Sequence, residues 1–190
     1  MPSSKELRQL LDLAHGFHLA EPKDAFGRCF AATLGFADFA DRHGHAIQLI
    51  HWQVTDDEDF CDHWAVLFKD TFVIDLTRVQ VDGKSDLLHQ VDTYPINYRR
   101  PRCYSPDVLL PNFRRLSKSR LAHLPFWFMW DCGVALARHD MCTAFRERKA
   151  GQFVVVAAEA AKFAGRSILI GLHYHLVRQP QSHIWHDTLK

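Results

Sequence analysis

A cysteine, a histidine and an aspartate that could perform nucleophilic catalysis occur in that order in the first half of the chain. Cys29 follows Gly27-Arg28 at the predicted start of a helix, His63 begins an apolar strand, and Asp75 ends the next strand. A thiol becomes a strong nucleophile when an imidazole removes its proton and a carboxylate orients the imidazole. The pattern predicts an activated cysteine nucleophile, with Cys29 as nucleophile, His63 as general base and acid, and Asp75 as orienting group.

The surroundings of Cys29 fit this chemistry. The unpaired N–H groups and the dipole at a helix N-terminus favour a thiolate. Gly27 allows the backbone to approach a substrate closely, and the backbone N–H of Cys29 could donate to a tetrahedral oxyanion. The sequence does not identify a second oxyanion donor. The candidate substrate-binding residues are Gly27, Arg28 and Trp64.

The connection between the two strands decides whether His63 and Asp75 can meet. Strand side chains alternate between faces, so direct pairing of His63 with Asp75 requires an odd-length connection, expected at Phe68-Lys69-Asp70. A two-residue turn at Lys69-Asp70 would instead place Asp75 opposite Trp64. The hypothesis therefore predicts an odd-length connection, with Trp64 pointing away from His63 and toward the core.

Hydrophobic periodicity indicates which elements must position these residues. The expected helix at 28–43 is apolar on more than one side, which is typical of a buried helix. Residues 81–116 contain four prolines and scattered charges, and we expect them to be mostly loop. The other expected elements are helices at 3–16, 125–148 and 151–164, and strands at 45–54, 62–68, 71–77 and 167–177.

The composition is that of an ordinary globular protein with a substantial core. The chain has 190 residues, of which 47% are hydrophobic and 24% are charged. A net charge of +1 gives no electrostatic reason to expect nucleic acid or an anionic membrane as partner. Five cysteines without a CxxC spacing argue against a disulfide framework, and no signal-peptide pattern is visible. We expect a cytoplasmic protein, although an effector delivered by a secretion machine would share these features.

The stretch from about Asp24 to Gln80 resembles the core of the papain-like superfamily, particularly its transglutaminase-like and NlpC-like (cell-wall endopeptidase) branches. Gly27-Arg28-Cys29, His63-Trp64-Ala65-Val66 and Ile74-Asp75-Leu76-Thr77 match the motifs of those proteins in order and approximate spacing. The resemblance implies a nucleophile-bearing helix packed on an antiparallel sheet, with the histidine and aspartate on adjacent strands. It also implies acyl transfer through a thioester, as a peptidase, amidase, deamidase or transglutaminase-like activity without a cofactor.

We therefore expect a single α+β domain over residues 1–190. A papain-like catalytic core would occupy 1–116, and a helical extension would occupy 117–190, with its final strand joining the sheet. The expected substrate is an amide in a peptide, a protein or a peptidoglycan-like polymer, and no nucleic acid or membrane partner is expected.

Two other interpretations stay open. The chain could be a catalytically inactive binding module or scaffold on the same fold, holding a protein through the aromatic run 126–130 or the basic clusters 99–102 and 114–120. A metal site is the other: Cys61-x-His63 and His173-x-His175 each place two ligands on one strand face. Zinc normally needs three or four ligands with recognisable spacing, so we expect no metal.

Overall fold

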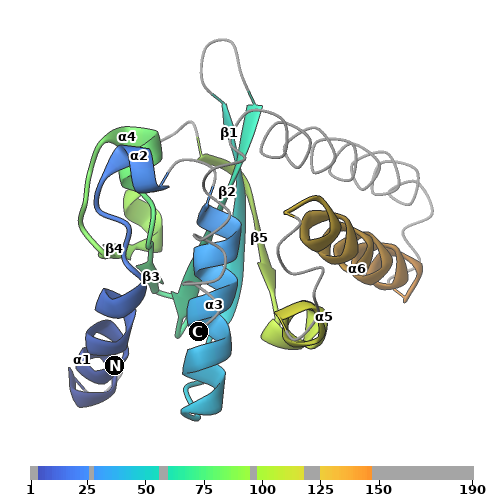
Figure 1. Ribbon diagram of the computed structural model, residues 1–190, viewed down its shortest axis with the longest axis horizontal. Coiled ribbons are helices and arrows are strands. Elements are labelled where there is room, and N and C mark those ends of the chain that lie inside the picture. The colour runs from blue at the N-terminus through green and yellow to red at the C-terminus, as the bar shows by residue number, and fades with distance from the viewer. Residues whose placement is uncertain (1–3, 26–27, 56–59, 95–97, 118–124, 147–190) are drawn as a thin grey trace. The chain divides into compact units, whose positions relative to one another are not determined.

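The computed structural model describes residues 4–25, 28–55, 60–94, 98–117 and 125–146 (Figure 1). The chain divides into two compact units, Met1–Pro106 and Asp107–Lys190. The boundary expected at residue 116 therefore lies inside the second unit. The first unit carries every candidate site residue.

The first unit is built on a five-stranded antiparallel sheet with strand order β4-β3-β2-β1-β5 (Figure 1). The sheet is curled like half of a barrel. Its mixture of helices and antiparallel strands confirms the α+β class. The strands are β1 (Gln48–Thr55), β2 (Phe60–Phe68), β3 (Phe72–Ile74), β4 (Leu88–Gln90) and β5 (Tyr98–Tyr104).

The expectation that residues 81–116 are mostly loop was wrong, because they contain β4, β5 and a helix at 110–117. In β5, two residues oppose one residue of β1, since Arg102 pairs with His51 and Arg99 with Gln53. This is the arrangement of a β-bulge, and Pro101 lies within it. Proline cannot donate to a strand ladder but is tolerated at a bulge or on an edge strand. The residue that suggested a loop therefore marks an irregular edge strand.

The helices of the first unit include the long helix that begins at Cys29. Helix α3 agrees with the prediction for 28–43 and ends before Gly44, which has a φ of 76°. Phe30 lies with its ring 4.9 Å from that of Trp64, and the Thr33 hydroxyl donates to the Trp64 carbonyl at 3.0 Å. Helix α3 therefore packs on the sheet face that carries Trp64. The helices are α1 (Ser4–Ala14), α2 (Pro22–Ala25), α3 (Cys29–Arg42) and α4 (Val79–Asp82), with a 3₁₀ turn at His15–Phe17.

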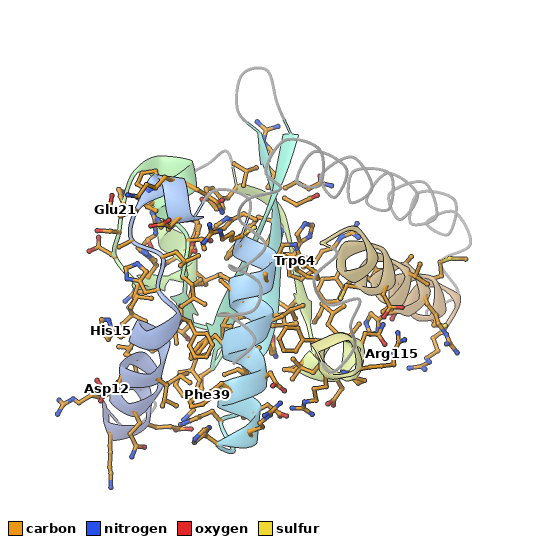
Figure 2. All side chains as sticks on the ribbon, viewed as in Figure 1. Asp12, His15, Glu21, Phe39, Trp64 and Arg115 are labelled. Atoms are coloured by element: carbon orange, nitrogen blue, oxygen red, sulfur yellow. The ribbon has the colours of Figure 1, made fainter. Side chains whose placement is uncertain are left out.

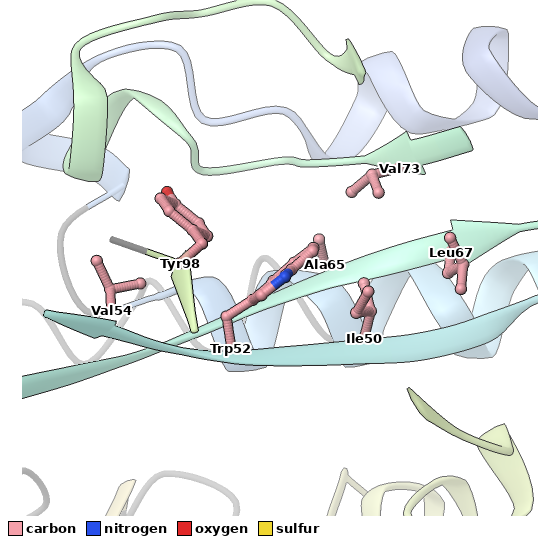
Figure 3. Packing of buried hydrophobic residues seen from close by; sticks show 7 residues of the cluster. All are labelled: Ile50, Trp52, Val54, Ala65, Leu67, Val73 and Tyr98. Carbon is pink, nitrogen blue, oxygen red and sulfur yellow. The ribbon is translucent and has the colours of Figure 1, made fainter. Parts of the chain in front are cut away.

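The opposite face of the sheet carries a cluster of buried apolar residues, shown in Figure 3. His63 lies on this face, because its ring is 6.2 Å from Trp52 and 5.6 Å from Tyr98 between centroids. His63 and helix α3 are therefore on opposite faces of the sheet. The cluster consists of Ile50, Trp52, Val54, Ala65, Leu67, Val73 and Tyr98.

The described part of the second unit contains helices α5 (Leu110–Ser117) and α6 (Pro125–Arg146), which an Arg115–Asp131 ion pair joins. Helix α6 agrees with the prediction for 125–148 and includes the backbone of the aromatic run 126–130. The expected helix at 151–164 and the strand at 167–177 lie outside the described residues. Within the described residues, no helix is both long and apolar enough to cross a membrane.

Candidate active site

The β2–β3 connection has the odd length that the candidate site requires. Phe68 pairs with Phe72, which leaves Lys69, Asp70 and Thr71 as a three-residue connection, one residue later than expected. The Phe68 carbonyl accepts a hydrogen bond from the Thr71 N–H at 3.3 Å, and Lys69 and Asp70 have φ angles of 52° and 56°. Two positive φ angles at the centre of a turn are typical of type I′. The prediction of odd length is confirmed, and its position is corrected by one residue.

The register brings Asp75 to the same face as His63, but not directly opposite it. Val66 pairs with Ile74, so Asp75, the next residue, is level with Ala65. His63 is therefore a diagonal neighbour of Asp75, and the expected direct pairing of the two was wrong. Diagonal neighbours on one face remain within reach of long side chains.

His63 and Asp75 form a buried pair. The distance from His63 Nε2 to Asp75 Oδ2 is 2.7 Å, and both side chains are 0% exposed. The Tyr94 hydroxyl donates to the same Oδ2 at 2.9 Å, and the Thr77 N–H donates to Oδ1 at 3.1 Å. A buried carboxylate is tolerable only when such donors replace its water shell. Three donors from three different residues therefore hold Asp75 in its ionised form.

The electrostatics of the pair favour carboxylate and imidazolium. Burial by itself would lower the pKa of His63, but the Asp75 charge and hydrogen bond outweigh it, and with a smaller contribution from Cys29 raise this pKa to about 10. Burial would likewise raise the pKa of Asp75, but His63, Thr77 and Tyr94 hold it below its ordinary value. The pair is therefore ionic at neutral pH.

Cys29 reaches this pair at an open edge of β2. Of the residues of β2, strand β3 pairs only with Val66–Phe68, so β3 does not cover the β2 edge at Asp62 and His63. The Cys29 thiol donates a weak hydrogen bond to the Asp62 carbonyl at 3.6 Å, and the thiol is one of the groups that raise the pKa of His63. Cys29 is the first residue of α3 and is 7% exposed. The structure thus brings Cys29, His63 and Asp75 together.

The three residues expected to bind substrate are placed differently. Gly27 lies outside the described residues. Arg28 is half-buried and directly precedes α3, where its carbonyl accepts a hydrogen bond from the Ala32 N–H at 2.9 Å. Trp64, labelled in Figure 2, is only 2% exposed and packs against Phe30 on the face away from the His–Asp pair. Trp64 therefore belongs to the core that α3 forms with the sheet.

Sequence reasoning missed the residues that surround the pair. Gln80, on α4, places its Nε2 3.3 Å from His63 Nδ1 and 3.2 Å from Thr77 Oγ1. Tyr94 was missed because it follows β4 in a segment that was expected to be loop. No motif marks either residue, and only the fold brings Gln80 to His63 and Tyr94 to Asp75.

A second histidine–aspartate pair lies on the opposite face of the same strand. His51 Nε2 is 2.9 Å from Asp62 Oδ1, and the two side chains are 9% and 14% exposed. The His51 ring also packs at 4.6 Å on that of Trp64. Residues 62 and 63 thus present one pair to each face of β2. Among the described residues, no group of three or more metal-ligating side chains is gathered.

No protein-family model, curated protein or solved structure matches this chain. The class is therefore defined by the fold and the site alone. The protein is an α+β protein in which a thiol at the start of a helix lies beside a buried histidine–aspartate pair.

Proposed function

We propose that this protein is a cysteine-dependent hydrolase or acyltransferase with a papain-like core, acting through a thioester on an amide or ester. The observation that carries the proposal is the fully buried His63–Asp75 pair, 2.7 Å apart, beside the thiol of Cys29. Burying two charges costs more desolvation energy than an apolar pair would, so such a pair is weak evidence for a purely stabilising role. Buried ionisable groups next to a nucleophile are typical of active sites.

The reaction follows from the roles that the three side chains can take. In the reactive state the His63 imidazolium holds the proton of Cys29 at the ring nitrogen that Asp75 does not occupy, and the Cys29 thiolate attacks the substrate carbonyl carbon. N–H groups at the start of α3 stabilise the oxyanion that forms. The imidazolium then gives its proton to the departing amine or alcohol, which leaves a thioester on Cys29. Attack on the thioester by water gives hydrolysis, and attack by an amine gives transamidation.

The papain-like assignment is supported by the order and placement of the elements. The nucleophile begins a buried helix, the base lies on a central strand, and the orienting carboxylate follows the neighbouring strand. The substrates of such a core are amides in peptides, proteins or peptidoglycan-like polymers.

Thiol reactivity tests the proposal. Alkylation with iodoacetamide near pH 6.5, followed by peptide mass spectrometry, compares Cys29 with the exposed Cys103 and Cys142 in one sample. We expect Cys29 to react fastest although it is buried, and His63→Ala to slow it about 100-fold, the size typical of loss of a general base. His43→Ala, at the far end of α3, is the matched control and should leave the rate of Cys29 alkylation unchanged.

Two further results complete the test. Intact-mass analysis after incubation with an activated ester such as p-nitrophenyl acetate should show one acyl group added to the protein. The Cys29→Ser variant should not form this thioester. Slow modification of Cys29, unaffected by His63→Ala, would reject the enzyme and favour the inactive binding module.

A further inference from the structure

The second ring nitrogen of His63 has a partner whose role differs from that of Asp75. Asp75 occupies Nε2, and the carboxamide of Gln80 lies 3.3 Å from Nδ1. The same amide nitrogen lies 3.2 Å from the hydroxyl of Thr77, and the backbone N–H of Thr77 donates a hydrogen bond to the Asp75 carboxylate. The Gln80 carboxamide therefore lies between the imidazole and the segment that carries the carboxylate.

We propose that Gln80 is a positioning residue that stabilises both proton states of His63 by turning its carboxamide. A carboxamide has a donor and an acceptor of nearly the same shape, and rotation by half a turn exchanges them. A neutral ring with its proton on Nε2 accepts at Nδ1, which suits the Gln80 N–H. An imidazolium donates at Nδ1, which suits the Gln80 carbonyl. The Thr77 hydroxyl can donate or accept, so it accommodates either orientation.

The role of this rotation in catalysis rests on the proposed function. While the imidazolium holds the proton of Cys29 on Nδ1, the Gln80 carbonyl accepts a hydrogen bond from it. When His63 passes that proton to the leaving group, the Gln80 N–H returns to the neutral ring. No covalent bond of Gln80 is made or broken, and the proton moves only from sulfur to nitrogen to the leaving group.

Other groups also influence His63, and the test must separate Gln80 from them. The Arg78 guanidinium lies 4.7 Å from the centre of the ring of Tyr94, whose hydroxyl donates to Asp75. Gln80 is uncharged, so substitutions of nearly equal size isolate its hydrogen bond. Apart from His63 and Asp75 themselves, the titratable groups near this pair are Cys29, Tyr94, Tyr98, His18 and His89.

The experiment measures the pKa of His63 directly by nitrogen-15 NMR of its imidazole, in a Cys29→Ala background. We expect Gln80→Glu to raise the pKa, because a carboxylate accepts only from the imidazolium. We expect Gln80→Leu to lower it, because the lost hydrogen bond to the imidazolium is charge-assisted and stronger than the lost bond to the neutral ring. The spread between the two variants should reach about one pH unit, tenfold in proton affinity, as for a neighbouring charge or hydrogen bond. Gln80→Asn, which withdraws the carboxamide by one methylene, should shift the pKa in the same direction as Gln80→Leu and replaces it if that variant does not fold.

The control is Gln48→Glu, which adds the same charge on β1 opposite Leu67, whereas His63 lies opposite Trp52. It should leave the pKa of His63 unchanged. An equal pKa in all Gln80 variants would overturn the inference, and a loss of acyl transfer without a change in that pKa would do the same and indicate an oxyanion donor. Because NMR does not require turnover, a shifted pKa in a protein without acyl transfer would support Gln80 and reject the proposed function.

Discussion

Removal of the Asp75 charge should change how the stability of the protein depends on pH. The perturbation is Asp75→Asn in a Cys29→Ala background, which removes the neighbouring thiol from the comparison. A rise in the pKa of His63 from 6.5 to about 10 corresponds to up to about 5 kcal/mol of stability, at about 1.4 kcal/mol per pH unit. This agrees with the loss of about 3–5 kcal/mol typical of a broken buried ion pair.

The sign follows from proton binding in the two states. Between pH 6.5 and 10 the folded protein keeps the His63 proton and the unfolded chain releases it, so stability falls as the pH rises. The contribution is fully present below pH 6.5. The lowered pKa of Asp75 reflects the same interaction, which is lost at the acid end and is counted once. In Asp75→Asn, burial is unopposed and the pKa of His63 falls below its ordinary value, so this decline disappears.

Urea unfolding at half-unit steps from pH 6 to pH 10 measures the effect. We expect the free energy of unfolding of the parent to fall more steeply than that of Asp75→Asn, by up to about 1.4 kcal/mol per pH unit. Asp70→Asn is the control, since it removes an exposed carboxylate in a turn where asparagine tolerates the positive φ. Parallel profiles for the parent and Asp75→Asn would refute the ionic pair at the centre of the site.

Three further substitutions test the supports of the site. Tyr94→Phe removes a hydrogen bond to the Asp75 carboxylate, so stability at pH 7 should fall by about 2 kcal/mol, and acid unfolding should begin at a higher pH, by urea and acid titration. Thr33→Val removes the bond from α3 to the Trp64 carbonyl and should cost about 1 kcal/mol in urea unfolding. Gly83→Ala, at a φ of 72° with open space around the added methyl, should cost about 1 kcal/mol of backbone strain, visible as a lower Tm.

The parts of the fold that could be predicted are those set by local pattern. Helix α3 was visible because its residues are apolar on several sides and Gly44 follows its end. The odd β2–β3 connection followed from the requirement that His63 and Asp75 share a face, and it needed no knowledge of the rest of the sheet. These features depend on residues close together in the sequence.

The parts that could not be predicted depend on how distant segments return to the sheet. Pro101 favoured the prediction of a loop where β5 lies, because the effect of a proline on a strand depends on whether the strand is central or at an edge. Gln80 reaches His63 from the segment between β3 and β4, and Tyr94 reaches Asp75 from the segment after β4. Neither residue belongs to a motif, so no local pattern could have assigned it to the site.

The choice between the two histidine–aspartate pairs shows what the geometry adds to the sequence. Asp62 and His63 are adjacent in β2, so strand alternation points their side chains to opposite faces. Each face of β2 therefore carries one histidine–aspartate pair, His51–Asp62 on one and His63–Asp75 on the other. His51 lies on the face that α3 covers, with its ring against Trp64, so packing fixes its environment. His63 is the histidine whose environment includes the Cys29 thiol, because β3 is too short to close the β2 edge there. The shortness of β3 therefore leaves the β2 edge beside His63 open to the thiol, which supports the proposal of His63 as the base.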